Sequence, residues 1–171
     1  SDIAVSIQSM KTILKPPGES WTNLILVTSA GRRDGKSTLS MLLAESFSRD
    51  FKTVLITADR DGWLAEFAKS EDAEQAGFNI VQYSDDLLDM MAEGFASEYQ
   101  LADRRKLLLG ADIAILDAPA MPLSTELLEI GQQADHTVLV AAWNPSRLHR
   151  IKRCARALEE MGIAISALAL N

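Results

Sequence analysis

The feature that most constrains the fold is a series of continuous apolar runs, each about as long as a β-strand. Four of them are clear, at residues 23–29, 53–58, 112–117 and 136–142. Strands buried on both faces have such continuous runs, and they are typical of parallel sheets covered by helices on each side. Residues 163–170 are predicted to form the last strand, and the shorter segment 78–83 is a further candidate.

Between these runs, apolar residues recur at helical spacing. The periodicity predicts helices at about 3–14, 39–47, 88–95 and 148–158, with Ser146 as the N-cap candidate of the last one. Pro16 and Pro17 end the first of these helices, because proline cannot continue a helix. The alternation of strands and helices predicts an α/β fold, a three-layer open sheet that is mostly parallel. Ligands of such sheets bind beyond the carboxyl ends of the strands.

Composition excludes several classes of protein. With 171 residues, 47% of them hydrophobic, the chain is expected to form a single domain over residues 1–171. No apolar run approaches the roughly 20 residues of a membrane span, so this piece is expected to be soluble, and its start at Ser1 indicates a fragment of a longer chain. The formal net charge of −7 argues against nucleic acid as a partner. Cys154 is the single cysteine, which fits a reducing cytoplasm.

Residues 28–40, TSAGRRDGKSTLS, lie between a predicted strand and a predicted helix. Gly35, Lys36 and Ser37 fit a phosphate-binding loop, in which backbone N–H groups surround phosphate, the lysine reaches the outer phosphates and the hydroxyl holds Mg²⁺. Ala30 replaces the first glycine of this motif, but it adds only a methyl group beside Gly31. A chance Gly-Lys-Ser in an ordinary turn is the alternative. The predicted nucleotide contacts in the loop are Ala30, Gly31, Arg32, Arg33, Asp34, Gly35, Lys36, Ser37 and Thr38.

Asp117 closes another apolar run, 113–116. A carboxylate at the tip of such a strand is well placed to approach the Mg²⁺ of a bound nucleotide. An acidic residue at a strand end is otherwise a common turn residue, so the loop motif is what favours the metal-binding interpretation.

Two basic segments each have two interpretations. Arg32 and Arg33 either add positive charge near bound phosphates or are solvated at the tip of an exposed loop. The segment 147–156, RLHRIKRCAR, is either a docking face for an acidic partner or membrane surface, or the solvated face of a helix.

Four stretches together carry a resemblance that covers nearly the whole chain: VTSAGRRDGKST, VLITADRDG, ADIAILDAPA and ISALALN. They resemble the bacterial tyrosine kinases attached to polysaccharide co-polymerases, a branch of the division-site and plasmid-partitioning ATPase superfamily. The resemblance implies a P-loop fold with ATP or ADP and Mg²⁺ as cofactors. It also implies Lys36 and Asp59 as catalytic residues, Ser37, Asp59 and Asp117 as metal ligands, and Asn171 as an adenine contact.

The chain departs from the family pattern in three places. Thr57 stands at the first aspartate of the family's Asp-x-Asp motif, where the family has its candidate base, and a threonine hydroxyl cannot serve as a base near neutral pH. Val5, Gln8 and Lys11 occupy the family's Glu-x-x-Arg-x-x-Arg positions, which join subunits into a ring. A tyrosine-rich tail is missing from this sequence. These departures predict impaired kinase activity and weakened ring assembly.

The leading expectation is a module that binds Mg²⁺ with ATP or ADP and regulates polymerisation and export of a surface polysaccharide. Its implied partner is a membrane co-polymerase segment or protein, which would tether it to the inner face of the membrane, and it could form a homo-oligomer through the first helix. Alternatives are a catalytically inactive nucleotide-bound scaffold, a partitioning or division-site ATPase, and a small-molecule kinase. The partitioning class has a signature lysine where this chain has Gly31.

Overall fold

The structure, a computed structural model, describes the backbone of residues 2–14, 22–83 and 110–171, with side chains from residue 7 onward. Its centre is a six-stranded sheet in the order β3-β2-β4-β1-β5-β6, in which every described strand pairing is parallel. The strands are β1 (Asn23–Ser29), β2 (Thr53–Thr57), β3 (Asn79–Gln82), β4 (Ile113–Ala120), β5 (His136–Ala141) and β6 (Ala167–Leu170). The predicted parallel α/β sheet is therefore confirmed.

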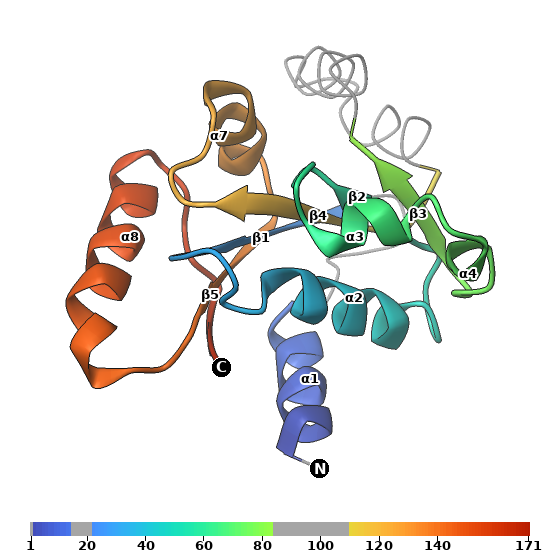
Figure 1. Ribbon diagram of the computed structural model, residues 1–171, viewed down its shortest axis with the longest axis horizontal. Coiled ribbons are helices and arrows are strands. Elements are labelled where there is room, and N and C mark those ends of the chain that lie inside the picture. The colour runs from blue at the N-terminus through green and yellow to red at the C-terminus, as the bar shows by residue number, and fades with distance from the viewer. Residues whose placement is uncertain (1, 15–21, 84–109) are drawn as a thin grey trace.

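Helices cover both faces of this sheet (Figure 1). They are α1 (Asp2–Ile13), α2 (Lys36–Phe47), α3 (Trp63–Phe67), α4 (Glu71–Glu74), α7 (Thr125–Gln132) and α8 (Leu148–Glu160), the last preceded by the 3₁₀ turn η1 (Pro145–Arg147). Within the described parts of the chain, no helix has both the length and the apolar character to cross a membrane.

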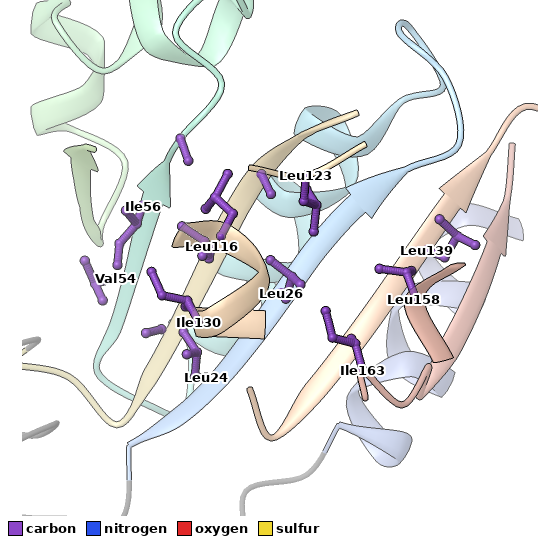
Figure 2. Packing of buried hydrophobic residues seen from close by; sticks show 14 of the residues in the cluster. Leu24, Leu26, Val54, Ile56, Leu116, Leu123, Ile130, Leu139, Leu158 and Ile163 are labelled. Carbon is purple, nitrogen blue, oxygen red and sulfur yellow. The ribbon is translucent and has the colours of Figure 1, made fainter. Parts of the chain in front are cut away.

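The core has two layers because the side chains of a strand point alternately to opposite faces. In β1, Leu24 and Leu26 face the layer under α7 and α8, where Leu158 is also buried. Figure 2 shows this layer, in which leucines and isoleucines from four strands lie beneath the helices. Ile25 and Val27 face the opposite layer, with residues of α1 and α2. The continuous apolar runs in the sequence thus reflect burial on both faces.

Details at the ends of elements differ from the sequence predictions. Ser146 is not the N-cap of α8: the side chain of Asn144 accepts a hydrogen bond from the Ser146 N–H at 3.0 Å and caps the turn η1 that precedes the helix. The last strand begins at Ala167 rather than at residue 163. The helix predicted at 88–95 lies outside the described residues. Helix α7 was not predicted; Ser124 is its N-cap.

The first helix rests on the second. The Lys11 ammonium donates to the Ser46 carbonyl at 3.1 Å and lies 3.4 Å from the Asp50 carboxylate, and Ile7 is buried in the layer beneath α1. Lys11, one of the three residues at the family's ring-forming positions, therefore already has partners within the chain, whereas Gln8 is exposed.

Candidate functional site

The candidate site lies where β1 ends and α2 begins. Gly35 precedes the helix with φ +93°, a left-handed conformation that favours glycine, and a Cβ there would lie 2.7 Å from Nδ2 of Asn171. Ala30 is 3% exposed and packs with Ala141 and Ile151, while its N–H donates to the Val140 carbonyl at 3.0 Å. The alanine that replaces the first glycine of the motif thus contributes its methyl group to a small apolar cluster.

Hydrogen bonds within the loop hold its shape. The Gly31 N–H donates to Asp34 Oδ2 at 2.8 Å, and the Ser29 hydroxyl donates to the Gly31 carbonyl at 2.8 Å. Asp34 is buried, and its carboxylate lies 3.8 Å from the Arg147 guanidinium. Arg33 has φ +63°, which is uncommon for a residue with a side chain. Arg32 and Arg33 are both exposed, so their side chains project from the tip of the loop.

Behind the loop, a lysine and two aspartates come together from three elements. Lys36 at the start of α2 donates to Asp59 Oδ2 at 2.6 Å, and its Nζ lies 4.0 Å from Asp117 Oδ2. The Ser37 hydroxyl donates to Asp117 Oδ2 at 2.7 Å, and the Ser40 hydroxyl donates to Oδ1 at 3.0 Å. Asp117 lies within β4, three residues before its end, and not at the tip of the strand as the sequence predicted. It is paired with Thr57 of β2 and Val27 of β1, so Asp59 just after β2 and the loop just after β1 lie beside it.

Burial determines the charge behaviour of this cluster. Burial raises the pKa of Asp117, while the Lys36 ammonium and the hydrogen bonds from Ser37 and Ser40 lower it and the Asp59 carboxylate raises it further. The net effect is a pKa above the usual range, so the folded chain disfavours this negative charge. A divalent cation at this place would offset that cost.

The residues present fit a magnesium ion and a phosphate group. Mg²⁺ prefers oxygen ligands, and Ser37, Asp59 and Asp117 offer a hydroxyl and two carboxylates around one ammonium group. Lys36, only 7% exposed, is the cation nearest to these carboxylates and lies at the N-terminus of α2, where phosphate binds favourably. The structure therefore brings together the three predicted metal ligands and the predicted catalytic lysine.

Thr57 is paired with Asp117 across the β2 and β4 strands. It is 2% exposed, and its Oγ1 has no hydrogen-bond partner within the described residues. Buried hydroxyls normally have a partner, so this one is available to a group that is bound at the site. The position that the resemblance assigns to the family's base therefore lies beside the cluster, but it holds a hydroxyl rather than a carboxylate.

Asn171 joins the end of β6 to the loop. Its Nδ2 donates to the Asp34 carbonyl at 3.4 Å, and the Asn171 carbonyl accepts a hydrogen bond from the Trp143 N–H at 2.8 Å. Thr38, the last predicted loop contact, is exposed on α2. Ser40 was not predicted as a site residue, although a hydroxyl one helical turn after Lys36 was a usable signal. The contact of the arginines at the start of α8 with the loop was not predicted either.

This sheet, with its loop between β1 and α2, defines the P-loop nucleotide-binding class of fold. Among solved structures, the chain is similar to the kinase domain of the Escherichia coli tyrosine kinase ETK, with 20% identity and a TM-score of 0.69 over 96% of this chain and 71% of that chain. The VpsO kinase domain gives 20% identity and a TM-score of 0.68, covering 98% of this chain and 93% of that chain.

The cell division protein MinD of Aquifex aeolicus is more distant, with 18% identity and a TM-score of 0.64 over 88% of this chain and 69% of that chain. No protein-family model matches the chain, and no curated protein matches its sequence. At these identities the likeness establishes the fold, which is that of the bacterial tyrosine kinase domains. The resemblance expected from the four sequence stretches is confirmed at that level.

Proposed function

We propose that this chain is a module that binds Mg²⁺ with ATP or ADP and is built like the bacterial tyrosine kinases, with impaired kinase activity. The observation that carries the proposal is the cluster of Lys36, Ser37, Asp59 and Asp117 behind a glycine-containing loop. Such a combination of one ammonium, one hydroxyl and two carboxylates has little use in a simple turn, and it costs free energy to bury.

Each of these residues has a role that follows from its position. The backbone N–H groups of the loop and of the first turn of α2 would bind phosphate oxygens, and Lys36 would exchange its contact with Asp59 for the outer phosphates. Ser37, Asp59 and Asp117 would hold Mg²⁺, which supplies neutralising charge for the phosphates when bound. Asn171, which contacts the loop, would face the adenine base of the nucleotide.

Thr57 is the reason for proposing impaired kinase activity. Phosphate transfer to a tyrosine needs a group that accepts the hydroxyl proton, and a neutral threonine does not accept one near pH 7. Asp59 is the nearest alternative carboxylate in the sequence, but in this proposal it would hold Mg²⁺ once the nucleotide is bound. The site is therefore better equipped to hold a nucleotide than to transfer its phosphate.

The biological role in this proposal is regulation of surface polysaccharide polymerisation and export. It is supported by the four motif stretches and by the fold that the chain shares with the kinase domains of ETK and VpsO. The proposed partner is a membrane co-polymerase segment or protein that tethers the module to the inner face of the membrane. The proposal also includes self-association of the module through α1.

A second candidate function is a nucleotide-bound scaffold without turnover. Thr57 favours it, because this buried side chain, whose hydroxyl has no partner in the part of the chain that the structure describes, cannot serve as a base. An assay of ATP hydrolysis separates the two functions, since the scaffold would bind ATP with no turnover above background. A partitioning-type ATPase is less well supported, because Gly31 supplies no side chain at the position of that class's signature lysine.

Calorimetric titration with ATP and Mg²⁺ tests the nucleotide site. Lys36→Ala is expected to lower ATP affinity by about tenfold or more, because a charged hydrogen bond to phosphate is lost. Lys69→Ala is the matched control, since Lys69 is exposed on the surface and pairs only weakly with Glu66 at 3.4 Å. Equal ATP affinity of Lys36→Ala and the unmodified protein would refute the assignment of this site.

A further inference from the structure

The start of α8 lies against the loop. Ile151 is 4% exposed and packs on Ala30, and the Cys154 thiol lies 3.9 Å from the Ala30 carbonyl. These two contacts fix which face of the helix meets the loop. The residue one turn before Cys154, Arg150, therefore lies on the same side of α8.

Two arginines reach the loop from this face. The Arg147 guanidinium lies 3.8 Å from Asp34 Oδ1, and Nη2 of Arg150 would lie 3.4 Å from a Cβ at Gly31. Gly31 has no side chain, so Arg150 can occupy the space beside its backbone. A larger residue at this position would have to share that space with the guanidinium and with Asp34, which lies 3.3 Å from the same point.

The hydrogen-bonding capacity of both guanidinium groups is largely unused. At 3.8 Å, the Arg147 and Asp34 contact is too long for a hydrogen bond, and no hydrogen bond from the side chain of either arginine is found within the described residues. Each guanidinium carries five N–H donors arranged to fit phosphate oxygens. Both arginines are also exposed enough to move towards a bound molecule.

Other basic residues near the loop are less suited to this role. Arg32 and Arg33 extend from its exposed tip, and Lys152 and Arg156 are exposed elsewhere on α8. In a chain with a formal net charge of −7, a pair of guanidinium groups held at the edge of the phosphate site is a local reversal of charge. The buried carboxylate of Asp34 lies 3.8 Å from the Arg147 guanidinium and attracts it to the loop.

We propose that Arg147 and Arg150 are phosphate-binding residues, delivered to the loop from α8 of the same chain. This inference rests on the proposed function, since it concerns how the same site holds its nucleotide. Asp34 keeps Arg147 beside the loop before a nucleotide arrives, and the phosphates then receive the N–H donors of both arginines. The basic segment 147–156 thus has a specific role at its amino-terminal end.

The test compares Arg147→Ala, Arg150→Ala and the variant with both changes. The control is a second double variant on the same helix, Lys152→Ala with Arg156→Ala. Affinity for a non-hydrolysable ATP analogue with Mg²⁺ is measured by calorimetry. Each single variant is expected to bind about tenfold more weakly, and the double variant more weakly still, because charged hydrogen bonds to phosphate are lost. The control pair is expected to stay within about twofold, as its side chains are solvated. Arg150→Lys should recover part of the loss.

A second measurement separates phosphate contacts from contacts to the base or ribose. Inorganic pyrophosphate is used to displace a bound fluorescent ATP analogue from the protein. From the double variant, pyrophosphate should displace the analogue less readily than expected from the analogue's own affinity. An unchanged pyrophosphate affinity together with a weakened ATP affinity would overturn the inference, since the arginines would then act on the nucleoside. Unchanged ATP affinity in the double variant would overturn it as well. In both cases normal binding by the unmodified protein and loss in Lys36→Ala would leave the proposed function intact.

Discussion

At the scale of single residues, the proposed impairment of kinase activity depends on Thr57. It is buried beside Asp117 on the neighbouring strand, and its hydroxyl has no partner within the described residues. Thr57→Asp would place a carboxylate two residues before Asp59, next to a site that already contains the charge of Lys36. If the rest of the site is sound, phosphate transfer or ATP turnover should rise by about 10²-fold or more, because a positioned base contributes about that much.

The measurement is the initial rate of ATP turnover and of phosphotyrosine formation with a tyrosine peptide supplied. Thr57→Asn is the control, since it adds a polar side chain of similar size to aspartate but no base. A gain in both variants, or strong activity of the unmodified protein, would contradict the role assigned to Thr57. No gain in Thr57→Asp with ATP affinity preserved would favour the scaffold.

At the scale of elements, the loop between β1 and α2 depends on the glycine at its end. Gly35 and Gly77 both have positive φ, at +93° and +81°, but a Cβ at Gly77 would have no neighbour within 4 Å. Both Gly35→Ala and Gly77→Ala are expected to lower the free energy of unfolding by about 1–2 kcal/mol, because alanine is strained in this conformation.

The two variants should differ in function. A Cβ at Gly35 would displace the side chain of Asn171, which is exposed and can move at little cost in stability, but its contact with the Asp34 carbonyl would be lost. Gly35→Ala should therefore bind ATP more weakly, while Gly77→Ala should bind it normally. Denaturant unfolding and calorimetry on the same preparations measure both effects, and equal ATP affinity in the two variants would refute this role of Gly35.

The same scale shows what could be read from the sequence. Strands β1, β2, β4 and β5 were predictable because burial on both faces produces continuous apolar runs. The start of α8 was not, because Asn144 and Ser146 are both good N-cap residues and only the structure shows that Asn144 caps the 3₁₀ turn Pro145–Arg147 ahead of the helix. Within the site, Lys36, Ser37 and Asp117 follow from motif positions. Arg147 and Arg150 do not, because their place depends on how α8 packs across the sheet.

At the scale of the whole molecule, the site is assembled from distant parts of the chain. The Ser37 and Asp117 contact joins residues 80 positions apart, and the Asn171 and Asp34 contact joins residues 137 positions apart. A ligand that binds these groups binds the folded state only, since the unfolded chain cannot bring them together. The proposed binding of a nucleotide would therefore stabilise the whole fold by mass action.

The expected size of this effect follows from linkage. ATP with Mg²⁺ at about 100 times its dissociation constant should add about 2.7 kcal/mol to the free energy of unfolding. For a chain of this length that corresponds to a rise in melting temperature of roughly 5–10 °C. Differential scanning fluorimetry measures the shift, with Lys69→Ala expected to behave like the unmodified protein. At the same ATP concentration, Lys36→Ala is expected to show about half of the shift or less, because a tenfold weaker affinity leaves about 1.4 kcal/mol of stabilisation. An equal shift in Lys36→Ala would mean that ATP stabilises the fold from somewhere other than the loop, since Lys36 lies between the loop and both carboxylates.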